Sequence, residues 1–221
     1  MPHDCLVFDL DGTLWDASKA TAVAWNQVLR QEGIDWREVT ADDVRAVTGM
    51  PHEECIQVSF PGLTEAQVKR VSDATMVEDS LAIERLGGEL YPEVVRGLWR
   101  LCGHKKLFIV SNCQKGYIEL FLMLNGLEGF FVDFECWGNT GRSKSENLRS
   151  IIDRNGLKNP VTIGDTEGDE KAARDCGVPF GFVEYGFGTA AAPDYSFDSF
   201  KALVNGLDGH WVDLDDNPIP F

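Results

Sequence analysis

Short apolar segments alternate with helix-like segments over much of the chain. The expected strands are apolar runs that end in polar or glycine-containing turns, and they span 5–8, 105–110, 130–134, 161–164 and 180–184. The helices expected between them span 92–102, 115–124, 144–155 and 168–176. Because strands that alternate with helices form parallel sheets, this pattern predicts a doubly wound parallel α/β sheet.

Residues 16–87 interrupt the alternation, because their apolar residues recur at helical spacing and no convincing strand occurs among them. Thr64 and Gln67 form a capping-box pattern, which predicts a helix over 64–85. Two earlier helices are expected from Ala20, Val23, Ala24 and Val28, and from Val44 and Val47 behind the capping residue Thr40. We therefore expect a helical cap, residues 16–87, inserted into a core of residues 1–15 and 88–221.

Composition and charge narrow the class of protein. The chain has 221 residues, 43% of them hydrophobic, so it can bury the core of one domain with or without an insertion. Its formal charge of -16 argues against nucleic acid and anionic membranes as partners, because both attract basic surfaces. The first residues lack the pattern of a signal peptide, and no uncharged stretch approaches membrane-spanning length. A cytoplasmic protein, either a monomer or a homodimer, is expected.

The six cysteines form no Cys-x-x-Cys pair, which argues against zinc binding and thioredoxin-like chemistry. Cys113 directly follows Ser111-Asn112, at the end of an expected strand. An inert structural thiol is the preferred interpretation of Cys113, because a reduced cysteine usually behaves as a small hydrophobe. A redox-sensitive thiol is the alternative.

Candidate chemistry lies where the expected strands end. Asp9 and Asp11 follow the first strand, and residues i and i+2 of an extended segment face the same way, so both carboxylates can address one ligand. An acidic turn without a chemical role is the alternative for this pair taken alone. Further polar residues lie at the ends of other strands or at the starts of helices: Ser111, Asn112, Lys144, Asp165 and Asp169. These groups are expected to converge, because ligands of parallel sheets bind outside the carboxyl ends of the strands.

In their order and spacing, these segments resemble the four motifs of the haloacid dehalogenase superfamily of phosphatases and phosphotransferases. The matching segments are Asp9-Leu10-Asp11-Gly12-Thr13-Leu14, Ser111-Asn112, Lys144 and 164–169. The resemblance covers nearly the whole chain and is nearest to the phosphoglycolate phosphatase-like branch. It implies a Rossmann-like core with a helical cap, and a small phosphorylated metabolite as the substrate, because a closed cap excludes macromolecules.

The chemistry of phosphate monoesters, together with this resemblance, assigns a role to each residue. Asp9 is expected to attack the phosphorus atom and form an aspartyl phosphate. Asp11 is expected to protonate the leaving alcohol and then to take a proton from the attacking water. The residues expected at the phosphate are Thr13, which would steady the loop of Asp11, and Ser111, Asn112 and Lys144.

Asp165 and Asp169 bring two more carboxylates to the same place. Two carboxylates about 4 Å apart repel by about 4 kcal/mol at an effective dielectric constant of about 20, so the cluster is expected to hold a cation. Oxygen ligands and a phosphate substrate favour Mg²⁺. We expect Asp9, Asp165 and the carbonyl oxygen of Asp11 to bind it directly, and Asp169 to act through water or by orienting Lys144.

The resemblance also separates alternative activities. Dehalogenases of the superfamily lack an aspartate at the position of Asp11, and phosphonate hydrolysis uses a cap lysine that the expected specificity loop, residues 47–54, does not contain. Sugar phosphomutases tend to carry an arginine in that loop, where this chain has His52. His52 is a candidate substrate contact, with an ordinary exposed histidine as the alternative.

The expected function is therefore a Mg²⁺-dependent phosphatase that hydrolyses a small phosphate monoester, phosphoglycolate-like or a sugar phosphate, through an aspartyl phosphate. A sugar phosphomutase is the first alternative. A non-catalytic scaffold that binds a phosphorylated ligand or a protein is an alternative of another class, although all the motif residues of an active enzyme are present.

Three other features are expected to carry no chemistry. Glu167 and Glu170 are interpreted as first-turn acids that favour the helix dipole. Residues 186–189 lack the third glycine and the helix of a phosphate-binding loop, so a plain loop is expected there. The acidic segment 213–216 near the end of the chain shows no recognisable motif.

Overall fold

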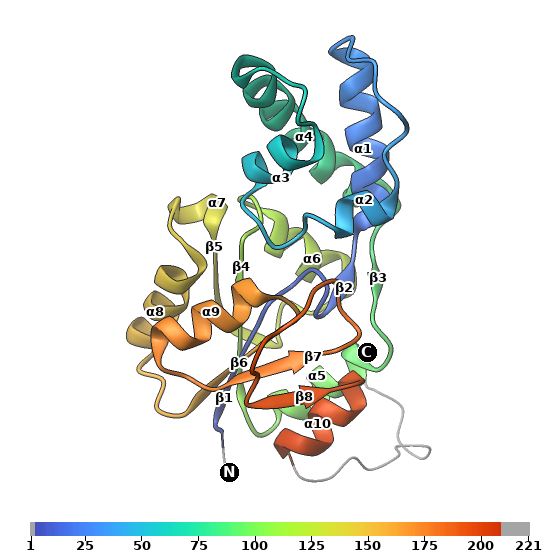
Figure 1. Cartoon of the computed structure of the whole chain (residues 1–221). Coiled ribbons are helices and arrows are strands. Elements are labelled where there is room, and N and C mark those ends of the chain that lie inside the picture. Colours follow the sequence, from blue (N-terminus) through green and yellow to red (C-terminus); the bar gives the residue numbers. More distant parts are fainter. Residues whose placement is uncertain (1–2, 209–221) are drawn as a thin grey trace.

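The structure, a computed structural model, describes residues 3–208, and the acidic segment 213–216 lies outside them. Its centre is a six-stranded parallel sheet with the strand order β5-β4-β1-β6-β7-β8 (Figure 1). The strands are β1 (Cys5–Phe8), β4 (Lys106–Ser111), β5 (Phe131–Cys136), β6 (Pro160–Gly164), β7 (Phe180–Val183) and β8 (Tyr195–Phe197). Because β1 lies between β4 and β6, the segments that follow these three strands meet at one edge of the sheet.

Helices cover both faces of the sheet, because alternate side chains of each strand point to opposite faces. Cys5 and Val7 pack against α8 (Lys144–Asn155) and α9 (Glu167–Cys176), whereas Leu6 and Phe8 belong to the cluster that includes α5 (Val94–Cys102) and α10 (Phe200–Asp208). Figure 1 shows these two pairs of helices on opposite sides of the sheet. The doubly wound α/β fold expected from the sequence is confirmed.

Four helices lie together above the carboxyl edge of the sheet (Figure 1), and we call them the cap helices. They are α1 (Ser18–Gln31), α2 (Ala41–Arg45), α3 (His52–Ser59) and α4 (Glu65–Leu86). The capping box of Thr64 and Gln67 is present, and Thr40 forms another with Asp43. The α6 helix (Tyr117–Asn125) packs against α4.

Several short elements were not expected from the sequence. The strands β2 (Trp15–Asp16) and β3 (Glu89–Leu90) form an antiparallel pair where the chain enters and leaves the cap helices. The expected specificity loop is shorter than 47–54, because α3 already begins at His52. The remaining unexpected elements are α7 (Trp137–Thr140), β8 and α10. The boundaries of the cap at residues 16 and 87 stay a prediction.

The first cap helix buries Ala20, Ala24 and Val28 of the expected stripe, but not Val23. Val23 is 43% exposed, whereas Ala24 and Trp25 are buried against the core. The interface between α1 and its neighbours thus lies on the side of the large indole ring. Among the described residues, no helix combines the length and the apolar character needed to cross a membrane.

Candidate active site

Asp9 is placed at the edge of the sheet by the ladder between β1 and β6. Its backbone N–H donates to the carbonyl oxygen of Ile163 at 2.8 Å, so the strand pairing continues up to this residue. The side chain of Asp9 is buried, whereas Asp11 is half-buried, and both line one pocket between the cap helices and the sheet. The two carboxylates thus address the same space, as expected.

Lys144 lies at the first residue of α8 and is nearly buried. Its Nζ atom forms ion pairs with Asp9 Oδ1 and, at 2.5 Å, with Asp169 Oδ1. Burial opposes the charge of Lys144, but the carboxylates of Asp169 and Asp9 outweigh this effect and raise its pKa. Lys144 is therefore a permanent cation beside the expected nucleophile.

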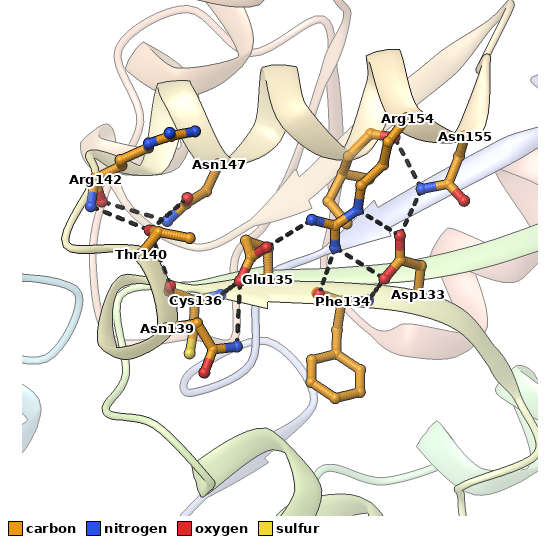
Figure 2. Close-up of polar contacts among 11 residues, drawn as sticks. Asp133, Phe134, Glu135, Cys136, Asn139, Thr140, Arg142, Asn147, Arg154 and Asn155 are labelled. Atoms are coloured by element: carbon orange, nitrogen blue, oxygen red, sulfur yellow. Dashed lines mark hydrogen bonds and ion pairs between the residues drawn. The ribbon is translucent and has the colours of Figure 1, made fainter.

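The α8 helix is anchored by a polar network at both ends, with Arg154 in its last turn and Asn147 in its first (Figure 2). Arg154 pairs with Asp133 at 2.7 Å and with Glu135 at 2.6 Å, both on β5. Nearer to Lys144, the hydroxyl of Thr140 donates to Asn147 Oδ1 at 2.8 Å. These contacts hold α8, the helix that carries Lys144, against β5 and α7.

Asp165 follows β6 and is completely buried. It accepts hydrogen bonds from the Thr13 hydroxyl at 3.1 Å and from the backbone N–H of Phe187 at 2.8 Å. Thr13 was expected at the phosphate, but its side chain is fully buried and its hydroxyl is directed to Asp165. Thr13 thus positions a carboxylate. The loop expected at 186–189 is present after β7, and it closes over Asp165.

Asp169 contacts Thr166, at the start of its own helix, as well as Lys144. Its Oδ2 atom accepts from the backbone N–H and the hydroxyl of Thr166, at 3.0 and 2.6 Å. The ion pair with Lys144 is the contact expected for a residue that orients this lysine.

Asp9, Asp165 and Asp169 form a compact acidic cluster, in which one ligand atom from each lies within 4.8 Å of the others. Burial, reinforced by the charge of Asp169, raises the pKa of Asp9 to about 6 and that of Asp165 to about 8. One lysine therefore does not balance the charge of this cluster. Buried oxygen ligands with excess negative charge fit Mg²⁺.

The Asp11 carboxylate is not among the grouped ligand atoms of that cluster. Its Oδ1 atom accepts a hydrogen bond from the Tyr117 hydroxyl at 2.7 Å, and burial raises the pKa of Asp11 to about 7. The backbone carbonyl oxygen of Asp11 therefore stays the one atom of this residue that we expect to bind a metal. Tyr117 was missed in the sequence, because nothing marks one tyrosine of a helix as the partner of a distant aspartate.

Ser111 and Asn112 lie at the end of β4, and both line the same pocket. The Asn112 amide donates to the carbonyl oxygen of Gly49 at 2.7 Å, which ties the sheet edge to the loop before α3. Ser111 is buried, with its hydroxyl oxygen 3.3 Å from the backbone nitrogen of Cys113. All the residues expected at the phosphate, apart from Thr13, therefore reach the pocket or pair with Asp9.

His52 is buried and lines the pocket from the cap side, so the alternative of an exposed histidine is wrong. Its Nε2 atom lies 2.8 Å from the Thr75 hydroxyl, and its Nδ1 atom lies 3.9 Å from Asp79 Oδ2. Burial lowers the pKa of His52 to about 4, so the ring is neutral at pH 7. Asp79 was not expected here, because nothing in the pattern of α4 distinguishes it from the exposed acids of that helix.

Two other interpretations are sharpened. Burial raises the pKa of the Cys113 thiol well above its usual range, which favours the inert structural thiol, because the thiolate is the reactive form.

Glu170 does more than favour a helix dipole, because it is buried and accepts from the backbone N–H groups of Ala191 and Ala192, at 2.7 and 2.9 Å. It fixes the path of the chain beyond the loop that covers Asp165.

Comparison with known proteins agrees with this geometry. The family model described as haloacid dehalogenase-like hydrolase matches residues 6–183, and the chain belongs to this family. A phosphoglycolate phosphatase of Aquifex aeolicus is 24% identical over 95% of this chain and 99% of its own length. Another, from Agrobacterium fabrum, is 26% identical over 91% of each chain. The protein is thus a hydrolase whose relatives are phosphatases, and the branch expected from the motifs is confirmed.

Solved structures show the same fold. A haloacid dehalogenase-like hydrolase from Streptococcus pneumoniae superposes with a TM-score of 0.82 at 21% identity, over 92% of this chain and 97% of that one. A predicted phosphoglycolate phosphatase from Haemophilus somnus gives a TM-score of 0.80 at 21% identity, over 93% and 96%.

Proposed function

We propose that the protein is a Mg²⁺-dependent phosphatase that hydrolyses a small phosphate monoester through a phosphorylated Asp9. The observation that carries the proposal is the convergence of Asp9, Lys144 and Asp165 from three separate segments, beside Asp11 in one pocket. Such an arrangement supplies a nucleophile, a fixed positive charge and a proton carrier around one phosphoryl group.

In the first step, one carboxylate oxygen of Asp9 attacks phosphorus while the bond to the leaving oxygen breaks. The carboxyl group of Asp11 gives its proton to that oxygen, and the leaving alcohol departs. Tyr117 occupies Oδ1 of Asp11, so Oδ2 is the atom for this transfer. Lys144 and the Ser111 hydroxyl bind the phosphoryl oxygens.

In the second step, water attacks the phosphorus atom of the intermediate and Asp11 takes its proton. The bond to Asp9 breaks, and inorganic phosphate and the free carboxylate are restored. Asp9, Asp165 and the Asp11 carbonyl oxygen would hold Mg²⁺, with Asp169 indirect because Lys144 and Thr166 already engage it. When bound, Mg²⁺ offsets the repulsion between the carboxylates and the phosphate.

The test is phosphate release from p-nitrophenyl phosphate and a panel of small phosphate esters, with and without Mg²⁺. We expect Asp9→Asn to lower kcat by at least about 10³-fold, since it removes the nucleophile. The matched control is Asp35→Asn, at an exposed aspartate, which keeps wild-type rates. Undiminished release by Asp9→Asn would refute the nucleophile, and no release from any ester would favour a scaffold.

Interconversion of sugar phosphates without net release would identify a mutase instead. The cytoplasmic location and the monomeric or homodimeric state stay predictions.

A further inference from the structure

One side of the pocket is built by the cap helices, and two of its polar groups, His52 and Asp79, lie close together. Trp25, His52 and Asp79 lie on three different cap helices and line the same pocket as Asp9 and Asp11. The Asp79 side chain is only 5% exposed. Its position therefore calls for a partner for each of its oxygen atoms.

Asp79 has one satisfied oxygen atom and one that is not. The Trp25 Nε1–H group donates to Oδ2 at 3.4 Å, whereas Oδ1 has no hydrogen-bond partner within the described part of the chain. A buried acceptor without a partner costs about 1–3 kcal/mol. A ligand group that donates a hydrogen bond to Oδ1 would remove this cost.

His52 presents a second acceptor beside it. The Thr75 hydroxyl donates its only hydrogen atom to the carbonyl oxygen of Val71 at 2.8 Å, so it accepts from His52 Nε2–H. In a neutral imidazole the other nitrogen then carries no hydrogen. His52 Nδ1, which lies 3.9 Å from Asp79 Oδ2, is therefore an acceptor too.

No cation of the described residues faces this side of the pocket, since neither lysine nor arginine is among its lining residues. Arg45 approaches the lining residue Phe187, but it is already paired with Asp16 and Asp42, each at 2.6 Å. Burial without a nearby cation raises the pKa of Asp79 well above its usual range, and a positively charged ligand group beside it would favour the carboxylate form again. A carboxylate bound here would be buried without a counter-ion, which costs several kcal/mol.

We infer that Asp79 and His52 select phosphate esters whose leaving group donates a hydrogen bond, from a hydroxyl or an ammonium group, over esters that carry a carboxylate. The inference rests on the proposed phosphatase activity. It predicts that this chain disfavours phosphoglycolate, the substrate in its relatives' names, because the glycolate part of that ester carries a carboxylate.

Four esters of one size and different ends test it: 2-hydroxyethyl phosphate, phosphoethanolamine, ethyl phosphate and phosphoglycolate. We expect kcat/KM for the hydroxyl or the ammonium ester to exceed that for phosphoglycolate by at least about tenfold, the effect of one buried hydrogen bond. The hydroxyl and ammonium esters differ in charge, so the ratio of their kcat/KM values tells which donor the pocket prefers.

Asp79→Asn should lower kcat/KM for whichever of the hydroxyl and ammonium esters the unmodified protein prefers by about tenfold, relative to kcat/KM for ethyl phosphate. Asp73→Asn, at an exposed aspartate of the same helix that pairs with Lys69, should keep the wild-type ratios. The wild-type panel decides even if Asp79→Asn does not fold.

A preference for phosphoglycolate, or equal rates for all four esters, would overturn the inference while p-nitrophenyl phosphate is still hydrolysed. If that general substrate and every ester resist hydrolysis, it is the proposed phosphatase activity that fails.

Discussion

Gly12 has little room beside the acidic cluster. Its φ of +86° lies in the left-handed region, and a Cβ atom built on it would come within 2.2 Å of Asp165 Oδ2. The chain can therefore turn after Asp11 and still lie against Asp165 only because this position has no side chain.

Gly12→Ala should displace the Asp165 carboxylate and lower kcat/KM by at least about tenfold, because a misplaced group strongly reduces catalysis. Gly33→Ala is the matched control, since its φ is +66° and nothing lies within 4 Å of the added Cβ. That control should cost only about 1 kcal/mol of stability and no activity. Equal kcat/KM values for both variants, measured beside their melting curves, would contradict the close approach.

Single residues of the site were predictable where their place in the pattern was informative. Asp9, Asp11 and Asp165 follow apolar strands, so the sequence alone placed them at the sheet edge. Tyr117 and Asp79 lie on helices, and which helical residue faces the pocket depends on packing that periodicity does not encode.

At the scale of elements, ion pairs attach the last turn of α8, the helix that carries Lys144, to β5. Arg154 binds Asp133, Glu135 and the carbonyl oxygen of Phe134 (Figure 2). Glu135 is itself nearly buried, so the loss of its cation leaves a poorly solvated charge.

Arg154→Met should lower the free energy of unfolding by about 2–3 kcal/mol, measured by urea denaturation. Lys171→Met removes an exposed pair with Asp175 on α9, and it should cost less than about 0.5 kcal/mol. A loss for Arg154→Met no larger than that of the control would show that the network does not stabilise α8.

The elements themselves were predictable when they were long enough to show a period. The capping box of Thr64 and Gln67 located the start of α4, and the strand–helix alternation located most of the core. The strands β2 and β3 could not be predicted, because strands of two residues each show no periodicity. Val23 was misplaced, since helical spacing does not say how far the buried stripe of a helix extends around it.

At the scale of the whole molecule, the excess negative charge of the acidic cluster links metal binding to stability. Ligands that bind only the folded state stabilise it, by about 2.7 kcal/mol at a concentration of 100 times Kd. For a chain of this length, that corresponds to a Tm increase of roughly 5–10 °C.

We therefore expect Mg²⁺ to raise Tm in a thermal melt and EDTA to reverse the increase. Asp165→Asn should remove most of the shift, whereas Asp175→Asn, at an exposed aspartate, should keep it. A Tm that does not respond to Mg²⁺ in the unmodified protein would argue against a metal at this cluster.

The strand order could be expected only in outline, because the alternation predicts a parallel sheet but not which strands are neighbours. That β1 lies between β4 and β6 depends on pairings between segments about 100 residues or more apart. The motif resemblance filled this gap, since it implied that the four segments share one site.

The cap helices α1–α4 are one continuous piece of chain, whereas Asp9, Lys144 and Asp165 come from outside it. Trp25, His52 and Asp79, which carry the proposed choice of substrate, all lie within that piece. A single recombination event with two crossover points could therefore replace them together and leave the phosphate chemistry intact. Such an exchange would change the choice of substrate while the residues that act on the phosphate stay in place.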